Sequence, residues 1–358
     1  MSKLFRSLID EAGRLTRSGN LRAATAAIQT ALAGARPGAD GAVIDIVARE
    51  VPQIMPVDKP VNPRRDGRAA VAPAASSFVA GSHADAAAGR RDYRLFIPPQ
   101  VEHGPLPLVV MLHGCTQDPE DFAAGTAMNE AALAQGFFVL YPAQSQQANP
   151  QRCWNWFKQN HQQRGRGEPS LIAGMTRDVM AQHSIDPARV YVAGLSAGGA
   201  MAAILGDAYP DLYAAVGVHS GLAAGAAADL PSALAAMKAG SASTGAGAGG
   251  TPTIVFHGDA DATVHPRNGE QAVAASAGAG ATIDEQRLPG AGGSGRASTR
   301  RVHRAADGRV LAEHWLVHGA AHAWSGGSAN GSYTDARGPD ATGEMLRFFF
   351  EHPRRPAH

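Results

Sequence analysis

One short stretch, residues 189–201, constrains the fold of this chain more than any other. Residues 190–193 are apolar, β-branched or aromatic and predict a buried strand, whereas residues 200–205 favour a helix. Between them lies Gly-Leu-Ser-Ala-Gly, with glycines where a tight strand-to-helix turn excludes side chains. Such a turn exposes Ser196 at the helix N-terminus, where backbone N–H groups stabilise negative charge. A chance pattern is the alternative, but the flanking strand and helix favour a nucleophilic serine.

The composition fits a globular protein with one large domain and a small addition. The chain has 358 residues, 44% of them hydrophobic and 18% charged, and its formal net charge is +1. This balance does not indicate binding to nucleic acid or to an anionic membrane surface. Residues 1–21 contain no continuous apolar stretch or small-residue cleavage site. We therefore expect no signal peptide, no membrane span and a cytoplasmic location, with secretion as the alternative.

The patterning along the chain divides it into three regions. Residues 1–32 have helical periodicity interrupted at 18–20, which predicts a helical hairpin docked on the main domain or on a partner. Residues 33–76 are rich in Ala, Gly and Pro and predict a flexible linker. Residues 77–353 alternate strand and helix patterns, which predicts an α/β domain with a mostly parallel central sheet flanked by helices.

The strands and helices expected in this domain follow from apolar runs and helical periodicity. The runs at 106–112 and 137–141 are continuously apolar, as is typical of strands covered on both faces. Glycine-rich loops are expected at 221–250, around a short helix at 231–237, and at 289–298. Further strands are expected at 77–83, 91–97, 214–219, 253–257 and 310–317, and helices at 121–135, 170–182 and 342–351.

A serine nucleophile needs a base, and the base needs an orienting carboxylate. In α/β-hydrolases the acid and then the histidine follow the serine along the chain, on loops after sheet strands. The acidic turn after residue 257 offers Asp259 and Asp261, and we favour Asp261 because it lies three residues past the glycine, leaving Asp259 to cap the turn. His322, in a small-residue loop after the last strand, is the expected base. His318, at the end of that strand, is its rival.

Two backbone N–H groups must stabilise the oxyanion of an acyl-transfer reaction. Ala197, which follows the serine, is expected to supply one, and Cys115 in the loop after residue 112 the other. His113 and His257 precede glycines at strand ends and are expected to hold loop geometry. The histidines and cysteines show no His-Glu-x-x-His or Cys-x-x-Cys spacing, so we expect no metal and no cofactor.

Together these motifs resemble those of the poly(3-hydroxybutyrate) depolymerase family of serine esterases, which is related to feruloyl and acetylxylan esterases. The resemblance covers roughly the region from residue 77 to residue 351 and implies an α/β-hydrolase catalytic domain at 77–353. It rests on the segments at 112–117, 153–157, 194–201, 257–264 and 322–327.

The resemblance also implies the roles of individual residues. Ser196 would be the nucleophile, Asp261 the acid and His322 the base, and Cys115 and Ala197 the oxyanion donors. Ser325 stands where the family usually has a proline after the tryptophan.

The substrate implied by the resemblance is a carboxylic ester of a short-chain hydroxyalkanoate polyester or oligomer, cleaved through an acyl-enzyme. A feruloyl or acetylxylan type of carbohydrate esterase is one alternative. A module that binds a polymer granule or a partner, with a vestigial hydrolase domain, is another. The sequence carries no indication of the oligomeric state.

The two cysteines and three of the four tryptophans lie in or beside these motifs. A disulfide between Cys115 and Cys153 would fix the oxyanion loop to the tryptophan segment, although a reducing compartment would keep both thiols free. Trp154 and Trp324 are expected to line an apolar substrate-binding cleft, with core packing as the alternative for these two and for Trp156.

Overall fold

The structure is a computed structural model, and it describes residues 76–85, 88–100, 104–241 and 250–354. The hairpin expected at 1–32 and nearly all of the linker expected at 33–76 lie outside these residues. None of the described helices combines the length and the hydropathy of a membrane-spanning segment.

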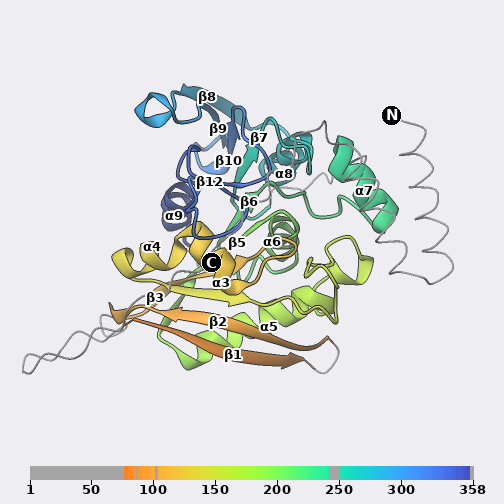
Figure 1. The fold of residues 1–358 in the computed structure, drawn as a ribbon, viewed down its shortest axis with the longest axis vertical. Coiled ribbons are helices and arrows are strands. Elements are labelled where there is room, and N and C mark those ends of the chain that lie inside the picture. Colours follow the sequence, from red (N-terminus) through yellow and green to blue (C-terminus); the bar gives the residue numbers. More distant parts are fainter. Residues whose placement is uncertain (1–75, 86–87, 101–103, 242–249, 355–358) are drawn as a thin grey trace, which may run out of the picture. The chain divides into compact units, whose positions relative to one another are not determined.

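A ten-stranded sheet runs through the described residues (Figure 1). Its strands are β1 (Ser77–Asp85), β2 (Gly89–Ile97), β3 (Leu106–Leu112), β4 (Phe138–Pro142), β5 (Ile185–Leu195), β6 (Ala215–His219), β7 (Thr253–Gly258), β8 (Thr282–Leu288), β9 (Ser298–Arg304) and β10 (Val310–Val317). They are ordered β1-β2-β4-β3-β5-β6-β7-β10-β9-β8. The strands from β4 to β10 in this order pair in parallel, and the pairs at both ends are antiparallel.

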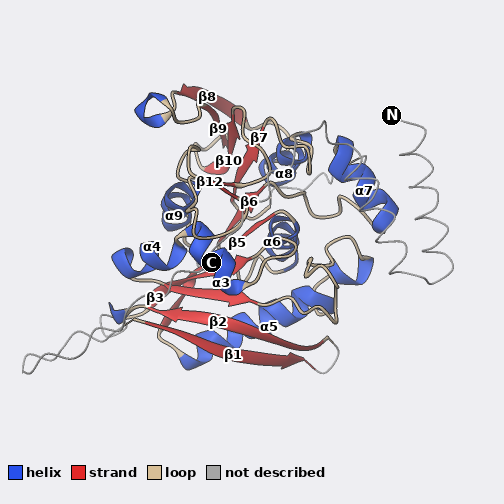
Figure 2. Cartoon of the chain, in the orientation of Figure 1, coloured by secondary structure: helices blue, strands red, loops and turns tan. Residues whose placement is uncertain are grey.

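Helices cover both faces of the sheet (Figure 2). They are α3 (Pro119–Thr126), α4 (Met128–Gln135), α5 (Gly167–Gln182), α6 (Ala197–Ala208), α7 (Leu230–Ala239), α8 (Arg267–Ala277) and α9 (Ala341–Glu351), with short 3-10 turns η2 (Gln159–His161) and η3 (Ala291–Gly293). Apolar side chains of α5 to α8 belong to one core cluster, and those of α3, α4 and α9 to the other. Val109 and Val110, neighbours in β3, are fully buried in opposite clusters, which explains the continuous apolar run there.

The α/β fold class is confirmed, and most predicted elements are present with boundaries shifted by a few residues. The single helix expected at 121–135 is wrong. The chain there forms α3 and α4, separated at Ala127, whose left-handed backbone (φ 51°) ends the first helix.

Two outer strands and one helix were not predicted. β8 and β9 extend the sheet beyond β10, and α8 lies between β7 and β8 along the chain.

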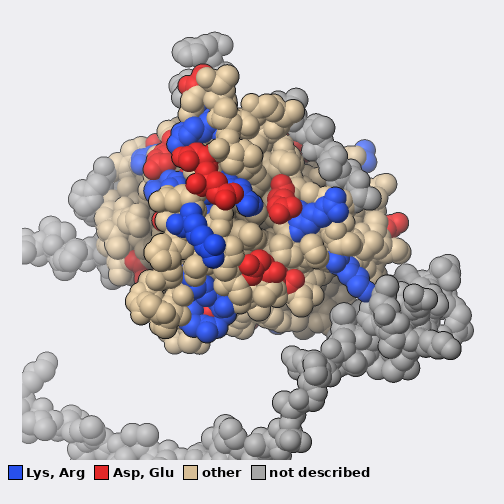
Figure 3. Space-filling view, turned by 90° about the horizontal axis from the view of Figure 1, so that it is seen from above, with Lys and Arg blue, Asp and Glu red and all other residues tan. Residues whose placement is uncertain are grey.

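Acidic and basic side chains lie close together on the face of the molecule seen in Figure 3. Ion pairs join Arg301 of β9 to Glu285 of β8, and Arg300 of β9 to Glu313 of β10. The outer strands are therefore held partly by charge pairs, which leave no apolar pattern in the sequence.

Candidate active site

The turn around Ser196 has the strained geometry that its sequence predicts. β5 ends at Leu195 and α6 begins at Ala197, so Ser196 alone makes the connection. Its backbone adopts φ 59° and ψ −119°, a region that costs an L-residue strain energy. A Cβ on Gly194 would overlap the backbone of Gly198, and one on Gly198 would overlap the carbonyl of Leu112. The glycines are therefore required by close backbone approach, and the hydroxyl is presented at the end of β5.

Asp261 and His322 form a hydrogen-bonded pair on neighbouring loops, after β7 and β10. Nδ1 of His322 lies 2.7 Å from Oδ2 of Asp261. The other carboxylate oxygen accepts the N–H groups of Thr263 and Val264, both at 2.9 Å. Burial favours a higher pKa for Asp261, but hydrogen bonds from His257 and His322 outweigh it and hold the pKa well below its usual range. The carboxylate stays ionised and orients the imidazole so that Nε2 can act as a base.

The rival residues Asp259 and His318 form a pair of their own. Nδ1 of His318 lies 2.9 Å from Asp259, whose other oxygen accepts the N–H of Gly319 at 2.6 Å. Nε2 of His318 lies 2.9 Å from the hydroxyl of Thr299 in β9. Both ring nitrogens of His318 are thus engaged. Nε2 of His322, in contrast, makes no hydrogen bond with the described residues.

His219 connects the serine turn to the loop of His322, and the sequence analysis missed it. Its carbonyl accepts the N–H of Ser196 at 2.8 Å, and its ring Nε2 accepts the N–H of Ser325 at 2.9 Å. The ring stacks on Trp324 with 5.0 Å between centroids. Burial lowers the pKa of His219 to about 3, so the ring remains a neutral acceptor. One buried residue therefore holds both segments.

The serine and histidine side chains are not joined by a hydrogen bond in this structure. Within the described ranges, the hydroxyl of Ser196 makes no hydrogen bond. Such contacts are often long in an enzyme without substrate and shorten in the complex. Transfer of a proton from Ser196 to His322 is therefore a proposal, supported by the shared attachment to His219.

The expected oxyanion donors lie at two adjacent strand ends. Ala197 is the first residue of α6, and the first N–H groups of a helix have no partner within it. The N–H of Cys115, in the loop after β3, makes no hydrogen bond with a described residue. Next to it, the N–H of Gly114 donates to the side-chain oxygen of Gln117 at 2.9 Å. This loop is therefore shaped by its own hydrogen bonds, and the N–H of Cys115 remains available.

The loop that carries Cys115 is tied to the segment after β4. A disulfide joins Cys115 to Cys153 in the structure. The indole N–H of Trp154 donates to the carbonyl of His113 at 3.1 Å. Burial lowers the pKa of His113 to about 4, and its neutral ring accepts the N–H of Gln144 at 3.1 Å. These contacts fix the loop from both sides.

The two tryptophans expected in a substrate-binding cleft are core residues, so that prediction is wrong. The side chain of Trp154 is fully buried and that of Trp324 is 1% exposed. Trp154 contacts the ring of His113, and the indole N–H of Trp324 donates to the hydroxyl of Thr342 at 3.0 Å. Trp154 supports the loop after β3, Trp324 packs against His219, and neither side chain has exposed surface to contact a ligand.

Glu168, in the first turn of α5, is a second residue that the sequence analysis missed. Its carboxylate is 1% exposed and accepts the backbone and side-chain N–H groups of Asn155, at 2.7 and 2.6 Å, and the amide of Gln144 at 2.5 Å. Burial opposes ionisation, but hydrogen bonding, first from His161, leaves the pKa of Glu168 lowered. The glutamate anchors the segment to which the oxyanion loop is bonded. A lone acid in a polar run gives no sequence signal of this role.

The fold and the site together define the α/β-hydrolase class. The histidine, the acid, the serine and the oxyanion loop follow β10, β7, β5 and β3, at the carboxyl ends of parallel strands. Among the described residues, no group of three or more His, Cys, Asp or Glu is placed to hold a metal ion.

The family model described as Esterase PHB depolymerase matches residues 91–297, more than half of the chain, and the chain belongs to this family. The match includes Ser196 and Asp261 and ends before His322.

Known proteins are similar in sequence to part of this chain. Poly(3-hydroxyalkanoate) depolymerase C of Paucimonas lemoignei is 33% identical over 229 residues, which cover 60% of this chain and 54% of that protein. Feruloyl esterase B of Thermothelomyces thermophilus is 34% identical over 140 residues, or 39% of this chain and 47% of that protein. The chain thus spans about half the length of these curated relatives.

A solved structure shares the fold. Acetyl xylan esterase from Aspergillus awamori superposes with a TM-score of 0.59 at 18% identity, covering 76% of this chain and 99% of that one.

Proposed function

We propose that this protein is a serine esterase that hydrolyses the carboxylic ester bonds of short-chain hydroxyalkanoate polyesters or oligomers. The observation that carries the proposal is the hydrogen bond between Asp261 and His322, on loops at the strand ends next to a serine held in a strained turn. Membership of the Esterase PHB depolymerase family and the similarity to a poly(3-hydroxyalkanoate) depolymerase support the choice of substrate.

The reaction uses the site in two half-reactions. Ser196 attacks the ester carbonyl while Nε2 of His322 takes its proton, and the N–H groups of Cys115 and Ala197 stabilise the oxyanion. The intermediate collapses, the C–O bond to the alcohol breaks, and His322 returns the proton to the leaving oxygen. Water then attacks the acyl-enzyme with His322 again as base, and release of the acid restores Ser196.

A carbohydrate esterase of the feruloyl or acetylxylan type is the second candidate. The similarity to feruloyl esterase B favours it. A panel of hydroxybutyrate oligomers, amorphous poly(3-hydroxybutyrate) granules, feruloyl sugars and acetylated xylan separates the two. Higher kcat/KM on hydroxybutyrate oligomers supports the depolymerase proposal, and higher kcat/KM on the carbohydrate esters replaces it.

The first test is the substitution Ser196→Ala. We expect kcat for p-nitrophenyl butyrate to fall by at least about a thousandfold, because the acyl-enzyme cannot form. Initial rates and an unchanged circular dichroism spectrum provide the measurement and the folding control. Turnover retained by the variant would remove the serine from the mechanism. A wild-type chain inactive on every ester would instead favour a binding module with a vestigial site.

A further inference from the structure

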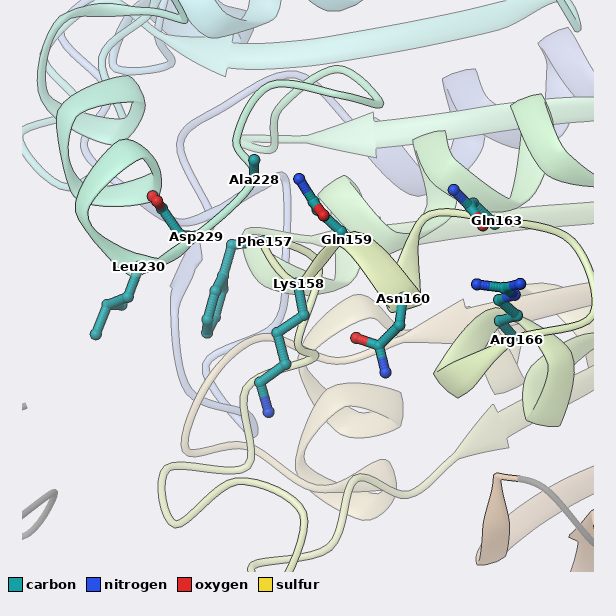
Figure 4. Close-up of a pocket in the computed structure, with 9 residues that line it drawn as sticks. All are labelled: Phe157, Lys158, Gln159, Asn160, Gln163, Arg166, Ala228, Asp229 and Leu230. Carbon is teal, nitrogen blue, oxygen red and sulfur yellow. The ribbon is translucent and has the colours of Figure 1, made fainter. Parts of the chain in front are cut away.

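A groove of about 560 Å³ lies between the segment that follows β4 and the segment that follows β6. One wall is formed by residues 157–166, which follow the disulfide-linked Cys153 along the chain. The other is formed by residues 228–230, which follow β6 and its last residue, His219. Figure 4 shows the side chains of both walls. Both walls therefore follow the carboxyl ends of parallel strands, as the residues of the proposed catalytic site do.

The two walls are held together by one side chain. The amide of Gln162 donates to the carbonyl of Trp156 at 2.8 Å and to the carbonyl of Ala227 at 2.7 Å. These are the residues immediately before each wall. The groove thus has a defined width before any ligand arrives, which lowers the entropic cost of binding.

Two cations line this groove without acidic partners. Neither Lys158 nor Arg166 forms an ion pair or a side-chain hydrogen bond with the described residues. Arg164, between them in sequence, is different, because it pairs with Asp211 and lies over the ring of Tyr209 at 4.6 Å. Lys158 and Arg166 are therefore free to meet an anion.

Two helices begin beside the groove, and each has an acidic residue at its start. α5 begins directly after Arg166, and its first turn carries the ionised Glu168, whose own N–H donates to the ring of His161 at 3.3 Å. α7 also begins here, and Asp229 caps it, accepting the N–H of Ser232 at 2.8 Å. The single carboxylate in the groove is thus committed to its own helix.

The groove also offers apolar contact. The ring of Phe157 lies near Leu230 and Lys158 in Figure 4. Cationic and apolar side chains together suit an aliphatic acid better than a compact inorganic anion. We propose that this groove binds the free carboxylate end of a short hydroxyalkanoate oligomer, attracted by the positive charges of Lys158 and Arg166, with Phe157 against its methyl groups. This inference depends on the proposed function for its substrate class.

The test compares two substrates that differ only in this charge. Kinetics of the full chain are measured with the trimer of 3-hydroxybutyrate as the free acid and as its methyl ester. We expect KM to be about fivefold lower for the acid, as an exposed ion pair allows. In the double variant Lys158→Gln, Arg166→Gln the ratio of the two KM values should approach one, and in the control variant Arg164→Gln it should stay as in the wild type.

Equal KM values in the wild type, or an unchanged ratio in the double variant, would overturn the proposal. If the chain hydrolyses neither trimer, the proposed function fails, and the groove is judged by binding alone. Calorimetric titration of Ser196→Ala with the acid trimer should then show binding that the two groove substitutions weaken. Equal affinity for acid and methyl ester, or no binding of either, would refute the proposal that the groove binds the carboxylate.

Discussion

At the scale of single residues, the two aspartates in the turn after β7 have separate partners. Asp261 is bonded to His322, whereas Asp259 is bonded to His318 and to the backbone of Gly319. Only the first pair leaves its histidine with a free nitrogen. The two carboxylates are therefore a matched pair for substitution.

The substitution Asp261→Asn should lower kcat on p-nitrophenyl butyrate by about 10⁴-fold, because an amide donor stabilises the wrong imidazole tautomer. Asp259→Asn should lower kcat by less than about threefold, since Asp259 only shapes the loop. Steady-state rates of both variants at neutral pH provide the measurement. A larger loss in Asp259→Asn than in Asp261→Asn would exchange the two assignments.

Residue types and their spacing were enough to nominate Ser196, Asp261 and His322, because each stands in a short motif next to a predicted strand. Spacing was not enough to predict the surroundings of Trp154 and Trp324 or the roles of His219 and Glu168. Whether an aromatic ring faces a cleft or the core depends on which segments pack around it. Buried polar residues such as Glu168 likewise acquire a role only from partners distant in the sequence.

At the scale of elements, the loop after β3 depends on the segment after β4. The disulfide Cys115–Cys153 and the indole of Trp154 join these two segments, and the carboxylate of Glu168 in α5 anchors the second of them. The proposed oxyanion donor, Cys115, is thus held by long-range contacts, and its own loop contributes only part of its rigidity.

The substitution Cys153→Ser tests this dependence and spares the N–H of Cys115. Opening a link across 38 residues should lower the free energy of unfolding by about 3 to 4 kcal/mol. We also expect kcat to fall, because the donor loses its fixed position. Urea denaturation and steady-state kinetics measure the two effects, and dithiothreitol should change the wild type but not the variant. An unchanged kcat would show that the loop is rigid without the link.

Most elements that could be predicted have a buried face, although β1 was predicted without one and α8, which has one, was not. The central strands gave continuous apolar runs, and α9 gave helical periodicity. β8 gave no signal, because nearly all of its side chains are exposed, and β9 is rich in arginine. Their strand structure comes from pairing with β10, which local sequence does not encode.

At the scale of the whole catalytic domain, buried neutral histidines couple stability to pH. Burial lowers the pKa of His113 to about 4 and those of His219 and His314 to about 3. In the unfolded chain these groups titrate near 6.5. Below that pH these histidines bind protons in the unfolded chain but not in the folded chain. The free energy of unfolding therefore decreases as the pH falls.

We expect each of these histidines to lower the free energy of unfolding by roughly 2 kcal/mol between pH 6.5 and pH 5. Urea denaturation at several pH values measures the slope. His113→Gln should reduce the slope, whereas substitution of the exposed His265 by glutamine should leave it unchanged. Equal stability at pH 7 and pH 5 would contradict the burial of neutral rings.

The outer strand β8 affects whether molecules of this protein associate with one another at high concentration. A strand at the edge of a sheet offers unpaired N–H and C=O groups to any other chain. β8 carries Asp284, Glu285 and Arg287, and Glu285 is already paired with Arg301. Another chain that docked there would have to strip water from these charges. These charges therefore oppose fibril growth through this edge. They are also the reason why the sequence of β8 did not predict a strand.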